Sequence, residues 1–152
     1  YKVNPLASMM AAPSEITSNK IALSEGPEHE VKMLNSGADG IMVFEPAVIK
    51  ISKGDTVNFR AVDMSHNSAS LEGMIPDGAE SWNGALSQDI SITFTEEGVY
   101  VYQCTPHAMM AMVGVIQVGD AVNLDSVKSQ ASQTKSVFIS NTDRLDDYLS
   151  RL

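Results

Sequence analysis

The chain has 152 residues, 43% of them hydrophobic, which is enough for one domain with a substantial buried core. Acidic residues outnumber basic ones by 19 to 10, so the positive surface by which proteins bind nucleic acid is absent. No apolar stretch approaches the roughly 20 residues of a membrane-spanning helix, so we expect no membrane span. The single cysteine, Cys104, cannot form a disulfide within the chain, so we expect core packing or a bound ligand to stabilise the fold.

Residues 1–27 show no sustained hydrophobic period and are predicted to be an extension or linker. They lack the basic start and unbroken apolar run of a signal peptide. The chain begins with Tyr1 instead of Met, so we expect that any leader has been removed.

Residues 28–119 are predicted to form an all-β domain, because short runs rich in Val, Ile, Phe and Tyr alternate with turns containing Gly, Pro and Asp. Strict apolar and polar alternation, as at residues 90–95, indicates strands with one buried face. The predicted runs are 30–35, 41–51 with a break near Pro46, 56–62, 67–72, 88–95, 99–104 and 113–118. They indicate a Greek-key sandwich or barrel of about eight strands.

Residues 120–152 are predicted to form two C-terminal α-helices packed on the barrel. Apolar residues recur with helical spacing at 124, 127 and 131, and again at 145, 148, 149 and 152. Thr142 precedes three aspartates and is predicted to cap the second helix. The Ser/Gln-rich residues 129–136 have no assigned role.

A thiol, an imidazole and a thioether follow one another at the end of a predicted strand, as Cys104, His107 and Met112. A second imidazole, His66, lies in the loop after the strand at 56–62. Two histidines, a cysteine and a weak axial methionine form the ligand set of electron-transfer copper sites. Soft sulfur suits Cu(I) and nitrogen suits Cu(II), so a stiff β framework holding both allows electron transfer with little rearrangement.

Each of these residues alone has an ordinary structural explanation. A single cysteine is commonly a small buried hydrophobic residue, and methionines commonly fill cores. His29, at the start of the first strand with no partner nearby in sequence, is expected to be solvated or hydrogen-bonded. The joint spacing of Cys-x-x-His and a following Met on a β pattern is a much more specific signal.

The sequence resembles the cupredoxins, the type 1 blue copper proteins, and among them the pseudoazurin family, from about Glu30 to the first C-terminal helix. The matching motifs are Glu30-Val-Lys-Met-Leu-Asn, Gly40-Ile-Met-Val-Phe-Glu-Pro, Lys53-Gly-Asp-Thr-Val, Ser65-His-Asn, Gly73-Met-Ile-Pro-Asp-Gly-Ala-Glu, Gly98-Val-Tyr, Cys104-Thr-Pro-His and Met112-Val-Gly-Val. The resemblance implies one type 1 copper ion, export to the periplasm, and single-electron shuttling to a reductase or cytochrome.

Carried over to this chain, the resemblance makes His66, Cys104 and His107 the equatorial copper ligands and Met112 the axial ligand. Asn67 matches a residue that ties the two ligand loops together in the family. A shorter ligand loop, found in some cupredoxins, would select Met110 as the axial ligand, but the match at residues 112–115 favours Met112. Met42 matches a residue beside the exposed histidine, although core packing explains it equally well.

The sequence departs from the family at the docking surface. Pseudoazurins usually surround the exposed copper edge with lysines, whereas the aligned residues here are Ser36, Met64, Asn83 and Gln103. Residues 27–119 carry twelve carboxylates against four basic side chains. We therefore expect a basic or mainly hydrophobic redox partner, such as a basic cytochrome c, in place of an acidic copper nitrite reductase. Docking near His107 is expected to use an apolar patch of Met42, Met64, Met109, Met110 and Pro76.

Three other functions compete with an electron carrier. Methionine abundance and acidity favour a copper chaperone or storage protein, but a cysteine with two histidines is a tight trapping site. An enzyme with several copper ions needs further histidine ligands, and only His29 remains, so we do not expect catalysis. A domain that has lost copper is disfavoured because all four ligand positions are filled. We expect a monomeric periplasmic carrier.

Overall fold

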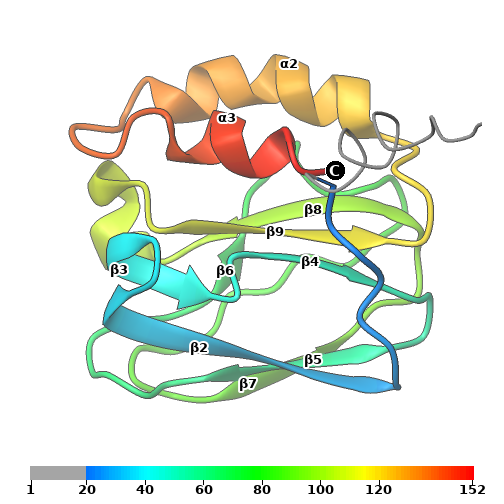
Figure 1. The fold of residues 1–152 in the computed structure, drawn as a ribbon, viewed down its shortest axis with the longest axis horizontal. Helices are drawn as coiled ribbons and strands as arrows, with labels where there is room; N and C mark the ends of the chain where they lie inside the picture. Colours follow the sequence, from blue (N-terminus) through cyan, green and yellow to red (C-terminus); the bar gives the residue numbers. More distant parts are fainter. Residues whose placement is uncertain (1–19) are drawn as a thin grey trace, which may run out of the picture.

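The computed structural model describes residues 20–152, which form two stacked β-sheets with two helices covering the outer face of one sheet (Figure 1). One sheet has the strand order β3-β2-β5-β7 and the other β4-β9-β8-β6. The strands are β2 (Glu28–Gly37), β3 (Gly40–Glu45), β4 (Val48–Ile51), β5 (Thr56–Arg60), β6 (Ala69–Ser70), β7 (Ile90–Thr93), β8 (Gly98–Gln103) and β9 (Val113–Val118). The helices are the 3₁₀-helix η1 (Thr105–Met110) and the α-helices α2 (Leu124–Lys135) and α3 (Arg144–Leu149).

The predicted fold class is confirmed, and each strand overlaps a predicted run, with β2 extending two residues beyond its run at both ends. The run 41–51 divides at Pro46 into β3, in one sheet, and β4, in the other. β2 pairs with β5 and β4 pairs with β9 in parallel, whereas the remaining strand pairs are antiparallel. The run 67–72 shortens to the two residues of β6.

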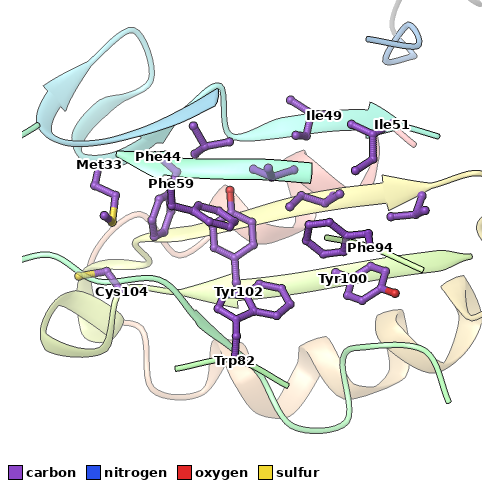
Figure 2. Close-up of a cluster of buried hydrophobic side chains, with 14 of the residues drawn as sticks. Met33, Phe44, Ile49, Ile51, Phe59, Trp82, Phe94, Tyr100, Tyr102 and Cys104 are labelled. Atoms are coloured by element: carbon purple, nitrogen blue, oxygen red, sulfur yellow. The ribbon is translucent and has the colours of Figure 1, made fainter. Parts of the chain in front are cut away.

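The core between the sheets follows from the alternation of side chains along the strands. In β2, His29, Val31 and Met33 point inward and are buried. Figure 2 shows buried aromatic side chains filling the space between the sheets, with Met33 and Cys104 at one end of the cluster. The ring centres of Phe44 and Tyr102 lie 4.7 Å apart, edge to face.

Strand β9 is buried on both faces, since one face meets the aromatic core and the other meets the helices. The predicted helical stripes are confirmed: Val127, Ala131, Leu145 and Tyr148 are buried against the outer face of this sheet. Gly114 has no side chain because a Cβ there would lie 2.2 Å from the Tyr102 ring.

The predicted cap of the second helix is wrong. Helix α3 begins at Arg144, and Asp143 occupies the N-cap position without a side-chain hydrogen bond. The turn before α3 is held instead by Asn141, which has a left-handed φ of 55° and donates from its side chain to the Met110 carbonyl. The Asn141 side chain therefore bonds to another loop, whereas its backbone carbonyl accepts from the N–H of Arg144, the first residue of α3.

The first nineteen residues of the predicted extension 1–27 lie outside the described residues. The rest of it follows β4: Leu23 forms a parallel bridge with Lys50, and Ile21 N–H donates to the Arg151 carbonyl. In residues 20–152 no helix is both long and apolar enough to cross a membrane.

Candidate metal centre

Three of the predicted ligands come together at one end of the sandwich. Cys104 follows β8, His107 lies in η1, and His66 lies in the loop between β5 and β6. Their ligand atoms all lie within 4.8 Å of one another. The Cys104 Sγ lies 3.3 Å from Nδ1 of His107 and 3.6 Å from Nδ1 of His66. Both imidazoles therefore present the same ring nitrogen to the sulfur.

The ligand loop, residues 104–112, folds back because it forms the short 3₁₀-helix η1. Pro106, in the first turn of η1, has its φ already suited to a helix start. The backbone N–H of His107 donates to the Cys104 carbonyl over 3.2 Å, which brings the imidazole back over the strand end. The loop closes where Cys104 N–H donates to the Met112 carbonyl over 2.9 Å.

His66 is fully buried, and its ring is oriented by Asn35 from β2. Nε2 of His66 lies 2.8 Å from Oδ1 of Asn35, an oxygen that can only accept a hydrogen bond. The proton of the neutral ring therefore lies on Nε2, which leaves the Nδ1 lone pair facing Cys104. Burial, followed by the nearby His107, lowers the pKa of His66 and favours this neutral form.

Asn35 is a functional residue that the sequence analysis missed. The signal that points to it is an asparagine in a strand, a position where asparagine is uncommon.

Cys104 is fully buried, and burial raises the pKa of its thiol, while backbone N–H groups of Asn67 and His107 oppose that shift. The Cys104 thiolate, which is the form that binds a metal, would be buried beside the imidazoles of His66 and His107, and a buried negative charge is costly unless a positive charge lies next to it. A soft cation supplies that charge, and this donor set suits copper. The residues present therefore fit a type 1 copper ion.

Asn67 joins the two ligand loops, as the resemblance predicts. Its Oδ1 accepts from the Thr105 N–H over 2.7 Å, and its Nδ2 donates to the Gly84 carbonyl over 3.0 Å. The loop that carries His66 is thus fixed to the loop that carries Cys104.

The two candidate axial methionines, Met112 and Met110, differ in burial. Met112 is fully buried and belongs to the same core cluster as Cys104 and Met33, whereas Met110 is partly exposed. Burial beside the thiol favours Met112 as the axial ligand. Met42 packs against the core cluster, which is one of the two roles predicted for it.

The expected docking patch is wrong in one member. Pro76 is buried beside Gly98, the first residue of β8, at the opposite end of that strand from Cys104. Met64 and Met109 are exposed by 69% and 55%. These two exposed methionines remain as members of the patch.

An eight-stranded sandwich that brings two histidines and a cysteine together at one end, beside a buried methionine, defines the class of single-domain type 1 copper proteins, the cupredoxins. Residues 31–119 match the sequence family described as copper binding proteins, plastocyanin/azurin family. The chain therefore belongs to the plastocyanin/azurin family of copper binding proteins, and the relatives that match it at 45–47% identity are pseudoazurins.

The similarity to pseudoazurins extends over both sequence and structure. The chain is 45% identical over 109 residues to the pseudoazurin of Paracoccus pantotrophus, covering 71% of this chain and 75% of that protein. The crystal structure of pseudoazurin from Methylobacterium extorquens AM1 superposes with a TM-score of 0.72 at 39% identity, covering 82% of this chain and 98% of that one. Native pseudoazurin from Hyphomicrobium denitrificans gives a TM-score of 0.71 at 36% identity, with the same coverage of both chains.

Proposed function

We infer that this protein is a single-electron carrier with one type 1 copper ion, and we propose that His66, Cys104, His107 and Met112 hold that ion. The observation that carries the proposal is the convergence of two Nδ1 atoms on one buried sulfur. When bound, copper supplies a Cu(I)/Cu(II) couple that stores one electron.

The chain's own residues keep the site rigid and partly accessible. Asn35 orients the buried His66, and Asn67 ties the two ligand loops together. His107 is the one ligand that is partly exposed, since the other three are fully buried. The edge of the His107 ring is therefore the point at which a partner approaches the site most closely.

The same burial argues against a copper chaperone or storage protein. Such a protein must release its ion, whereas three of the four proposed ligands here are inaccessible to solvent. Catalysis at several copper ions needs further free histidines. His29, the remaining histidine, has both ring nitrogens hydrogen-bonded, so it offers no ligand atom.

The proposed partner is a redox protein with a basic or apolar docking face, for which a basic cytochrome c is favoured over an acidic copper nitrite reductase. Met64 and Met109 are exposed, and Ile139, exposed by 77%, donates its N–H to the Met109 carbonyl over 2.7 Å. All three side chains are exposed and uncharged, on a chain whose net charge is −9. Small apolar interfaces suit carriers that must release their partner quickly.

We propose that the protein acts in the periplasm, as the family resemblance implies, and that it acts as a monomer. Cell fractionation and size-exclusion chromatography test these two points. Recovery in the cytoplasmic fraction, or elution as a stable dimer, would contradict them.

The visible spectrum after adding Cu(II) to the metal-free protein tests the proposed site. We expect an intense thiolate-to-copper band that Cys104→Ser abolishes, because the band requires the sulfur ligand. A pale spectrum from the unmodified protein would refute the proposal.

A matched pair of variants tests the axial ligand. Met112→Gln is expected to keep the colour and lower the reduction potential, since the axial ligand tunes the potential. Met110→Gln, two residues away in the same loop, is expected to leave the potential nearly unchanged. The reverse result would assign the axial position to Met110.

The dependence of electron-transfer rate on ionic strength tests the partner. Rates with a basic cytochrome c are expected to fall as salt is added, because salt screens the attraction. Rates with an acidic nitrite reductase that fall as salt is added would contradict the proposal.

A further inference from the structure

Arg144, the first residue of α3, is buried and reaches the copper end of the sandwich. Its guanidinium donates only to backbone carbonyl oxygens, and no carboxylate of the described residues forms a salt bridge with it. Nη1 donates to the carbonyls of Met42, Ala111 and Met110 over 2.9, 3.2 and 3.5 Å. Nη2 donates to the carbonyls of Ile41 and Asp39 over 3.2 and 3.3 Å.

These acceptors belong to two separate parts of the chain. Met110 and Ala111 are in the ligand loop, immediately before the proposed axial ligand Met112. The other three acceptors lie in and just before β3, in the β2–β3 hairpin. The guanidinium of one residue in a C-terminal helix therefore joins the ligand loop to the hairpin. Arg144 lies more than thirty residues along the chain from the ligand loop, which is the nearer of the two segments in sequence.

Two of the acceptors have an unfavourable backbone conformation. Met42 has a φ of 51° and Ala111 a φ of 57°, in the left-handed region that residues with a Cβ rarely adopt. Their carbonyls receive the two shortest hydrogen bonds from Nη1. Such conformations persist only where the surrounding structure holds them, and Arg144 supplies contacts that do so.

The segment before α3 holds the same loop from the outside. Asn141 Nδ2 donates to the Met110 carbonyl over 3.1 Å, and Ile139 N–H donates to the Met109 carbonyl over 2.7 Å. Successive carbonyls of the ligand loop, from Met109 to Ala111, thus all bond to residues 139–144. The loop is held by the C-terminal segment as well as by its own turn.

We propose that Arg144 is a positioning residue of the copper site, which fixes the Met110–Ala111 backbone and thereby the placement of Met112. A guanidinium suits this role because its several N–H donors point outward in one plane and can reach two segments at once. Lysine keeps the charge but not the planar fork. The inference deepens the proposed function, since it rests on Met112 being a copper ligand.

The test compares three substitutions in the full chain. Arg144→Met removes every donor, Arg144→Lys keeps the positive charge, and Arg151→Met removes a charge two residues beyond α3, where Arg151 pairs with the exposed Asp147. Amide hydrogen exchange of the metal-free protein reports on the loop, and the reduction potential of the copper-loaded protein reports on the ligands. Val101, in the buried strand β8, serves as the reference amide.

Both Arg144 variants are expected to speed exchange at the Ala111 and Met112 amides by about tenfold, the effect of losing one hydrogen bond to a charged group. Both are also expected to shift the reduction potential in the same direction. Arg151→Met is expected to change neither quantity, and the Val101 amide is expected to stay unchanged throughout.

Three results would overturn the proposal: wild-type exchange and potential in both Arg144 variants, full restoration by Arg144→Lys, or equal effects from Arg151→Met. If neither Arg144 variant folds, Arg144→Gln, which keeps one amide donor group in place of the guanidinium fork, replaces them, and a smaller change at the same amides is expected. Wild-type exchange and potential in Arg144→Gln would then overturn the proposal. Exchange in the metal-free protein does not depend on copper, so a wild-type chain that fails to turn blue would refute the proposed function separately.

Discussion

Strand β2 contributes one residue to each of two sites that contain a buried histidine. The two sites differ in how many ring nitrogens of the histidine are hydrogen-bonded to the surrounding protein. Near its start, His29 contacts Ser24 Oγ through Nδ1 over 3.0 Å and Asp55 through Nε2 over 2.8 Å. Near its end, the Asn35 side chain holds one ring nitrogen of His66, Nε2, over 2.8 Å. Because Asn35 holds Nε2, the Nδ1 of His66 is left to face the Cys104 sulfur.

Both imidazoles are buried, so burial alone does not separate a ligand from a structural histidine. The number of ring nitrogens that the protein satisfies does separate them. A ring with two protein partners stabilises the fold, whereas a ring with one partner is oriented and still has a lone pair to offer. The predictions below test this distinction.

The largest effect is expected when a proposed ligand is removed and compared with its structural counterpart. His66→Gln should abolish the intense visible band of the copper-loaded protein, because one of the nitrogen ligands is lost. His29→Gln should keep the band and lower the melting temperature. Visible absorption and thermal unfolding measure both, and loss of the band in folded His29→Gln would break the distinction.

Removing the partner of His66 should have a smaller effect. Asn35→Leu frees the His66 ring to rotate or change tautomer, and substitutions behind metal ligands typically weaken metal binding by about 10–100-fold. Competition with a copper chelator measures the affinity. Asn58→Leu, in β5 with a side chain bonded to Glu28, is the matched control and should bind copper normally. Unchanged affinity in Asn35→Leu would show that the loops alone orient His66.

The His29 site should matter for stability and not for copper. Asp55→Asn is expected to lower the free energy of unfolding by about 1–2 kcal/mol at neutral pH, because hydrogen bonds to a charged group become neutral ones. Its visible spectrum with copper should be unchanged. Urea unfolding measures the difference, and equal stability at pH 7 would contradict the assignment.

The same variant gives a pH dependence. Burial favours a higher pKa for Asp55, but hydrogen bonds from His29 and the Ser52 N–H outweigh it and hold the pKa below its ordinary value. The carboxylate therefore stabilises the folded protein above its unfolded pKa of about 4, and this contribution is lost as pH falls through the lower folded pKa. The difference in free energy of unfolding between wild type and Asp55→Asn should therefore shrink in acid. A difference that grows as pH falls would contradict the lowered pKa of Asp55.

The smallest effect concerns a buried polar group that belongs to neither site. The Tyr102 hydroxyl has no hydrogen-bond partner among the described residues, and burial raises its pKa well above the ordinary value. Tyr102→Phe should change the free energy of unfolding by less than about 1 kcal/mol or raise it, because no bond is lost. A large loss would reveal a partner for this hydroxyl.

Much of the fold and of the site could be predicted from local patterns. The alternation at 90–95 and the stripe at 145, 148 and 149 specified a strand and a helix correctly, since each depends on neighbours a few residues apart. Cys104 and His107 lie three residues apart, so one turn brings them together. The predicted Thr142 cap and the place of Pro76 were wrong, because both depend on contacts with distant loops.

The sequence by itself determined the β-sandwich class, the presence of a soft-metal ligand set and the acidic charge, because periodicity, residue type and composition are local properties. Only the tertiary structure decided that His29 pairs with Asp55, that Asn35 orients His66, and that Arg144 reaches the ligand loop. These contacts join residues 26 to 33 positions apart, brought together by strand pairing and helix packing. The spacing of residues along the chain does not predict such long-range contacts. The free energy that stabilises them comes from burying whole faces of sheets and helices.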